Sequence, residues 1–161
     1  MIISLCALLL AGAEPPQEVH GPGELPVDAY TQSNANAGTD PFEGQRMFEA
    51  FGGKPGITRI VADLVARNQQ DPRVADIFRG QDMVRLHRTL GEQFCHILGG
   101  DCDYSGRDMQ AAHEHMGLQH ADMNALVENL QAAMAAEGVP FRLQNRFLSK
   151  LAPMREDVIE R

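Results

Sequence analysis

The sequence has little positive charge and no long apolar run, and both shortages exclude classes of function. Lysine and arginine number 14 against 22 aspartates and glutamates, which gives a net charge of −8. An acidic surface repels phosphate backbones and anionic lipid, so we expect no nucleic-acid binding. No stretch of about 18 apolar residues is present, so we expect no membrane span once a signal segment has been removed.

Familiar catalytic signatures are absent as well. The sequence contains no Ser-His-Asp pattern, P-loop, paired CxxC or glycine-rich dinucleotide motif, and no alternation typical of strands. At 161 residues with 43% apolar content, the chain is long enough for one buried core. These features predict a single all-α domain.

Two segments precede that domain. Residues 1–13 form an apolar run that ends on small residues, which is typical of a secretory signal, although no Lys or Arg comes before the run. A weak anchor, a start further upstream and a buried helix are the alternatives. Residues 14–40 are rich in Pro, Gly, Asn, Gln and acid, so we expect a disordered linker. The folded domain would then span residues 41–161 and be exported to the periplasm.

Four stretches of the domain carry apolar residues three and four positions apart, which predicts amphipathic helices. They run from Ile57 to Leu64, from Met83 to Ile97, from Met123 to Met134 and from Phe147 to Val158. Asp82 is placed to cap the second stretch. Ordinary core packing explains most of these apolar residues.

One segment differs from these stripes because it centres on a histidine. It reads DMQAAHEHMGL, with His113 after two alanines, and it follows the leucine-rich helix. A histidine in this setting can present a neutral nitrogen to an apolar cavity, although most histidines near apolar residues are not ligands. The leucine-rich helix and the His113 segment would form two neighbouring walls, and we expect room between them for a flat apolar ring.

This segment, with the Gly-Gly pairs at residues 52–53 and 99–100, resembles the group I truncated haemoglobins over about residues 48–158. The resemblance implies their truncated globin fold, a two-over-two helical sandwich. It implies haem b as cofactor, with His113 as the proximal iron ligand. The other cofactor contacts on this side and at the haem edge would be Met109 and Phe78.

The distal side departs from the family pattern. Where many members place a tyrosine and glutamines that donate to oxygen, this sequence has Val65, Leu86 and Leu90, none with a donor. A donor to a partly charged ligand contributes about 1.5–3 kcal/mol, so we expect oxygen to leave about ten- to a hundredfold faster than from tyrosine-lined relatives. His87 or Gln93 would overturn this expectation by turning inward; the alternative for His87 is a position facing solvent.

Three cysteines are present, and Cys6 lies in the expected signal segment. Cys95 and Cys102 flank the second Gly-Gly pair, whose turn would let the two thiols meet. A disulfide there would close a loop of about eight residues and contribute about 2–3 kcal/mol through reduced chain entropy. A buried thiol at Cys95 and an exposed one at Cys102 are the alternative.

The resemblance implies a monomeric protein that binds O2, NO or CO, with a reductase as partner for any redox turnover. A side activity as a nitric oxide dioxygenase would need oxygen to stay bound. Two other functions remain open. One is a periplasmic haem redox or peroxidase-like enzyme, which needs a distal acid-base group. The other is a helical interaction module without haem.

Overall fold

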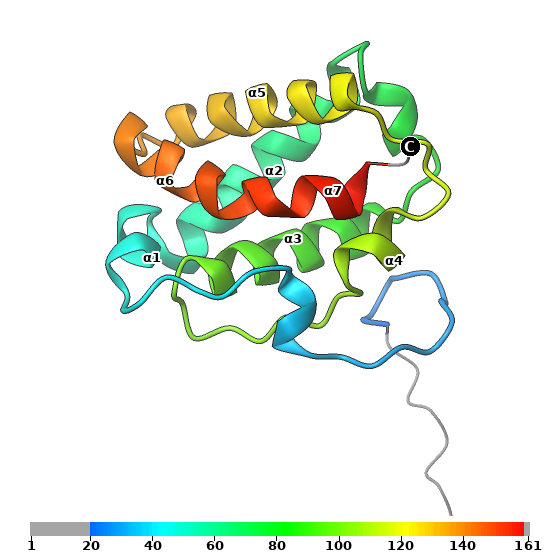
Figure 1. The fold of residues 1–161 in the computed structure, drawn as a ribbon, viewed down its shortest axis with the longest axis horizontal. Helices are drawn as coiled ribbons and strands as arrows, with labels where there is room; N and C mark the ends of the chain where they lie inside the picture. The colour runs from blue at the N-terminus through cyan, green and yellow to red at the C-terminus, as the bar shows by residue number, and fades with distance from the viewer. Residues whose placement is uncertain (1–19, 160–161) are drawn as a thin grey trace, which may run out of the picture.

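The structure, a computed structural model, describes residues 20–159. The expected signal segment 1–13 and the first part of the expected linker lie outside the described residues. Within residues 20–159 the chain forms helices and no strand (Figure 1). The elements, in order, are η1 (Asn34–Ala37), α1 (Arg46–Ala50), α2 (Gly53–Gln70), η2 (Ala75–Phe78), α3 (Met83–Ile97), α4 (Met109–His113), α5 (His120–Ala136), α6 (Phe141–Leu151), η3 (Ala152–Met154) and α7 (Arg155–Val158).

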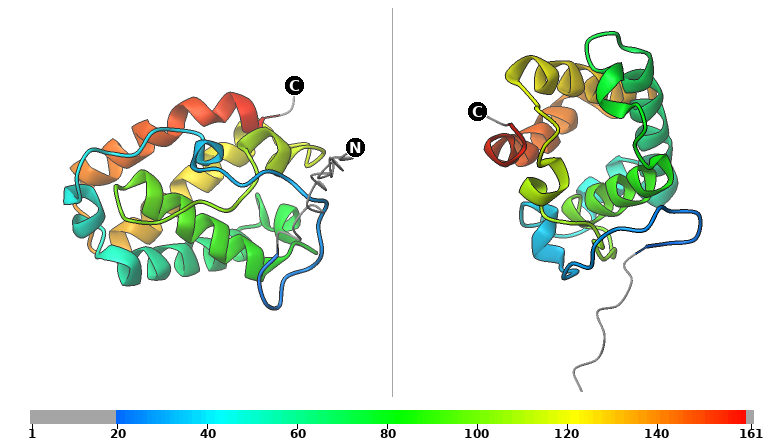
Figure 2. Two further views of the ribbon diagram at one scale, coloured as in Figure 1. Left: turned by 90° about the horizontal axis from the view of Figure 1, so that it is seen from below. Right: turned by 90° about the vertical axis from the view of Figure 1, so that its right-hand side faces the viewer.

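Two antiparallel helix pairs build the body of the molecule. Helix α3 returns beside α2, and α6 with α7 returns beside α5 (Figures 1 and 2). The apolar stripes meet between the pairs, where the Phe147 ring packs edge to face on Phe94 and Phe51, at centroid distances of 5.0 and 5.3 Å. The expected two-over-two, all-α fold is confirmed. No helix of the described part is long and apolar enough to cross a bilayer.

Side-chain caps begin the two helices that matter most for the site. The Asp82 carboxylate accepts a hydrogen bond from the backbone N–H of Arg85 at 3.0 Å, as the sequence predicts for the start of α3. Asp108 accepts from the N–H of Ala111 at 2.8 Å and begins α4. Each cap satisfies an otherwise unpaired N–H group, so both helices start at defined residues.

Residues 20–45, which we call the N-terminal arm, lie along α3 and the loop before α4 (Figure 1). Ala37 is fully buried, the Tyr30 hydroxyl donates to the Ser105 carbonyl at 2.8 Å, and the Asn34 side chain accepts from the Tyr104 N–H at 2.7 Å. This corrects the expectation of disorder over residues 14–40 from His20 onward. The arm needs no core of its own because it docks on helices that are already formed.

A buried carboxylate fixes the start of the arm. The Glu24 side chain is 1% exposed and lies between two arginines of α3, Arg85 and Arg88. Arg88 Nε donates to Glu24 Oε1 at 2.5 Å, and this bond is the main reason why the pKa of Glu24 is lowered to about 2. The arm is therefore held to α3 by an ion pair that composition alone does not predict.

Candidate functional site

A cavity of about 400 Å³ lies between the helix pairs and is closed in part by the arm. Its volume falls within the range of about 300–1,000 Å³ that is usual for small-molecule sites. Half of the residues that line it have apolar side chains. They are Val27, Leu64, Ile77, Phe78, Leu86, Leu90, Met109, Ala112, Met116, Leu118 and Leu126.

His113, the last residue of α4, lines this cavity. Its Nδ1 lies 2.7 Å from the Met109 carbonyl oxygen. Because a carbonyl can only accept, Nδ1 carries the proton and Nε2 keeps its lone pair. Burial lowers the pKa of His113, and the bond to Met109 opposes this only in part, so the imidazole is neutral at physiological pH. A neutral imidazole with a free lone pair is the form that binds a metal.

The structure brings most of the predicted cofactor contacts to one place. Phe78 reaches the cavity from η2, Leu86 and Leu90 from α3, and Met109 from α4 beside His113. His115 lies apart from them, with a side chain that is 88% exposed.

Val65 is the exception among the predicted contacts. It is 1% exposed within the core and does not line the cavity, whereas Leu64 and Asn68 of the same helix do. Residues four apart share a helix face, while Val65 is rotated by about 100° from Leu64. On α2 the cavity is therefore lined by Leu64 and the amide of Asn68, and not by Val65 as the sequence predicts.

His87 and Gln93, the two residues of α3 that the sequence offers as possible donors to a bound ligand, do not direct a free donor into the cavity. His87 is exposed, is not among the lining residues, and its Nδ1 lies 2.7 Å from the Met83 carbonyl. Gln93 lines the cavity, but its Nε2 donates to the Ala37 carbonyl at 2.9 Å. The Gln93 amide thus holds the arm.

Sequence reasoning missed several residues that line the cavity, among them Asn68 and two residues of the arm. Asn68 is the fourth residue after Leu64 in α2, and this spacing alone places the two side chains on one face of the helix. Val27 and Tyr30 come from the arm. No sequence signal identifies them, because the arm lacks a periodic pattern.

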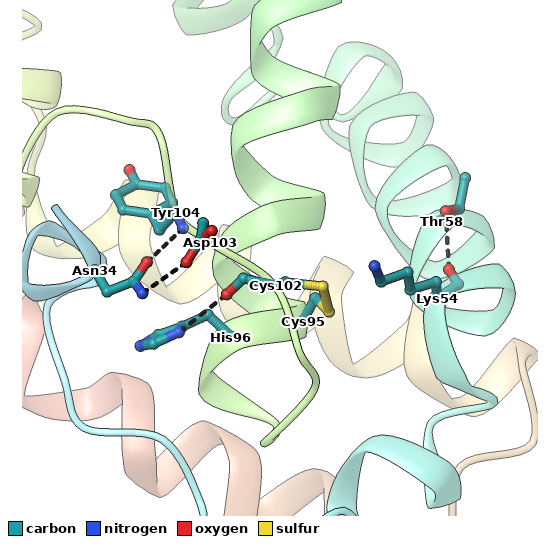
Figure 3. Close-up of a disulfide and its surroundings, with 8 residues drawn as sticks. All are labelled: Asn34, Lys54, Thr58, Cys95, His96, Cys102, Asp103 and Tyr104. Carbon is teal, nitrogen blue, oxygen red and sulfur yellow. Dashed lines mark hydrogen bonds between the residues drawn. A yellow bond between two sulfur atoms is a disulfide. The ribbon is translucent and has the colours of Figure 1, made fainter. Parts of the chain in front are cut away.

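A disulfide joins Cys95 of α3 to Cys102 across the Gly-Gly turn, with their Cα atoms 5.9 Å apart (Figure 3). Gly99 has a φ of 87°, and a Cβ at this residue would collide with the Gly44 carbonyl oxygen, so only glycine fits. The Asn34 amide donates to Asp103 at 3.0 Å, directly after the bridge (Figure 3). The disulfide therefore constrains the loop that receives the arm and leads to α4.

Residues 46–160 match the family of bacterial-like globins. The chain belongs to this family, among the group I truncated haemoglobins. A group 1 truncated haemoglobin of Nostoc commune is 28% identical to it over 115 residues, which are 71% of this chain and 98% of that protein.

Solved truncated haemoglobins share the fold. The crystal structure from Tetrahymena pyriformis in its Fe(III) form has a TM-score of 0.69 and 27% identity. The 2/2 haemoglobin from Synechococcus sp. PCC 7002, in the cyanomet state with covalently attached haem, has a TM-score of 0.66 and 26% identity. Each comparison covers 71% of this chain and 98% of the other. The family match begins at residue 46, so the arm of this truncated haemoglobin lies outside it.

Proposed function

We propose that this truncated haemoglobin holds haem b in the cavity, with Nε2 of His113 as the proximal iron ligand, and binds a diatomic gas such as O2, NO or CO on the opposite side. The observation that carries the proposal is the neutral imidazole of His113 at an apolar cavity. The haem iron supplies the gas-binding chemistry. The chain supplies the ligand and the enclosure that keeps water away.

The lining suits both faces of such a cofactor. Leucines on α3 and α5, together with Phe78, offer apolar surface to a flat ring. Arg107 also lines the cavity, and within the described residues it has no carboxylate partner. Its guanidinium lies 5.3 Å from the centre of the Tyr30 ring and donates to the Asp28 carbonyl at 3.4 Å. A propionate of the cofactor would neutralise this charge.

The α3 wall favours gas binding over peroxidase-like catalysis. Peroxide cleavage needs a distal group that moves a proton, and Leu86 and Leu90 cannot do so. Oxidation of nitric oxide is proposed as a side activity only, since it requires a reductase as an electron-donating partner.

We also propose that the protein is exported to the periplasm and acts there as a monomer. The apolar segment 1–13 and the pairing of Cys95 with Cys102 support export, because disulfides persist in oxidising compartments. Alkylation and mass spectrometry of protein recovered from the periplasmic fraction should find both thiols blocked. Two freely alkylated thiols in that fraction would contradict the proposal, and gel filtration tests the monomer.

Haem titration of the purified apoprotein, followed by the Soret band, tests the central assignment. Wild type should bind haem one to one, and His113→Ala should lose the band of a histidine-ligated haem. His115→Ala is the matched control, because that side chain is 88% exposed and should change nothing. A spectrum of His113→Ala that equals wild type would contradict the proposed ligand.

A further inference from the structure

Asn68 is a buried polar side chain that lines the cavity, and its side-chain nitrogen donates no hydrogen bond to the described part of the protein. It is 1% exposed and lies on α2. Its Oδ1 accepts a hydrogen bond from Nδ2 of Asn129 at 2.9 Å. Within the described residues, its own Nδ2 donates to no protein acceptor. Every side-chain nitrogen or oxygen of these residues that is completely buried has a hydrogen-bond partner, so Nδ2 must be in contact with open space. Nδ2 therefore borders the cavity that Asn68 lines.

A neighbouring carboxylate fixes which way the Asn68 amide points. Nδ2 of Asn129 also donates to Asp71 Oδ2 at 3.1 Å. The Arg73 hydrogen bond keeps the pKa of Asp71 low, so Asp71 is ionised and can only accept. Asn129 must therefore direct its NH2 group toward both partners, and Asn68 accepts this hydrogen bond with its side-chain oxygen. Two N–H groups of Asn68 are left for the cavity.

Apart from Arg107, which the proposed function pairs with a propionate of the cofactor, the other uncharged polar side chains with donors that line the cavity and are not exposed already have acceptors. Each donates to a backbone carbonyl, so turning it toward a ligand would break an existing bond. These donors are Tyr30 to Ser105 at 2.8 Å, Thr89 to Arg85 at 3.0 Å, Gln93 to Ala37 at 2.9 Å and Tyr104 to Arg107 at 2.9 Å. Gln81 is exposed to solvent, and Arg85 is paired with Glu24.

We propose that Nδ2 of Asn68 donates the hydrogen bond that retains a polar diatomic ligand in this cavity, a role that the leucines of α3 cannot fill. Helices α2 and α4 lie on opposite sides of the helical body, so Asn68 and His113 approach the cavity from different directions (Figure 2, right). The proposal rests on the proposed function, since the ligand is the gas held opposite His113. It makes Asn68 a residue that selects O2 over the less polar CO.

Ligand kinetics and infrared spectra of the haem-loaded protein test this role. Asn68→Leu keeps the size of the side chain and removes the donor. We expect its O2 dissociation rate to rise about tenfold to a hundredfold, and its CO rate to change less. The stretching frequency of carbon monoxide bound to the protein should move upward, because a positive dipole has been removed. Gln69→Leu is the matched control: it removes an exposed side-chain amide on the same helix, α2, that does not line the cavity, and it should match wild type.

A measurement on the unmodified chain does not depend on how well the variant folds. In ¹⁵N-labelled ferrous protein, the side-chain amide protons of Asn68 should differ in chemical shift between the O2 and CO forms, with one shifted downfield by O2. Equal shifts in the two forms would overturn the proposal, as would unchanged O2 rates in an Asn68→Leu protein with a full haem band. Wild type without any haem band would instead overturn the proposed function itself.

Discussion

The helical body, residues 46–159, and the N-terminal arm, residues 20–45, keep their structures by different means. The body buries stripes of large apolar side chains, and Phe147 and Ile97 are 0% exposed. The arm buries only Ala37 to that degree, and otherwise depends on hydrogen bonds and ion pairs with α3 and the following loop. Both nevertheless contribute to one cavity. A segment without a hydrophobic core can thus form part of a cofactor site when a folded surface receives it.

Removing residues 1–40 should have the largest effect on stability and on haem retention. The deletion loses several hydrogen bonds to the body, each contributing about 0.5–1.5 kcal/mol, and more where charge is involved. We expect the free energy of unfolding to fall by about 3–5 kcal/mol, as measured by urea titration. Haem should also pass faster to an acceptor apoglobin, because Val27 and Tyr30 no longer close the cavity. An unchanged urea midpoint would show that the arm contributes nothing to the folded state.

Replacing both Cys95 and Cys102 with serine should have the next largest effect, because it frees the loop on which the arm docks. Reduced chain entropy predicts a loss of about 2–3 kcal/mol in the free energy of unfolding. Wild type measured with a reductant should lose the same amount. If the reductant has no effect on wild type, the bridge is absent from the protein in solution.

Glu24→Gln tests whether the arm depends on charge. Gln keeps one acceptor oxygen but loses the ion pair, so we expect a loss of about 1–2 kcal/mol at neutral pH. The pKa of Glu24 is lowered from its ordinary 4.5 to about 2, so its contribution is complete above pH 4.5 and is lost as the pH falls toward 2. Urea titrations of both proteins should therefore converge at low pH.

Glu43→Gln is the matched control for this prediction, since Glu43 is exposed in the same arm. It should change the free energy of unfolding by less than about 0.5 kcal/mol at any pH. An equal loss in both variants would mean that net charge, and not the pair with Arg88, accounts for the effect.

The smallest effect is expected for His87→Ala in the body. His87 is exposed and lies on the solvent side of α3. Stability should change by less than about 0.5 kcal/mol, and the O2 dissociation rate should stay the same. A faster O2 rate measured by stopped flow would place His87 in the distal pocket and contradict the structure.

The body was largely predictable from the sequence, because helix periodicity and the Asp82 cap are local signals. The choice between Val65 and Asn68 was not, because the rotation of α2 about its axis is decided by packing against other helices. The order of the arm was not predictable either. The composition of a segment indicates how much apolar surface it can bury by itself. It does not show that the Glu24 carboxylate accepts hydrogen bonds from arginines about 60 residues away along the chain. The hydrogen bond from Gln93 to the Ala37 carbonyl of the arm also joins residues far apart in the sequence, so it was not predictable either.

Resonance Raman spectroscopy of the ferrous, ligand-free protein tests the central claim most directly, since it detects the bond between iron and the proximal histidine. Wild type should show an iron–histidine stretching band that shifts when the histidines carry ¹⁵N. The band should vanish in His113→Gly and return when imidazole is added to fill the space. A band that persists unchanged in His113→Gly would contradict the assignment of His113 as the ligand.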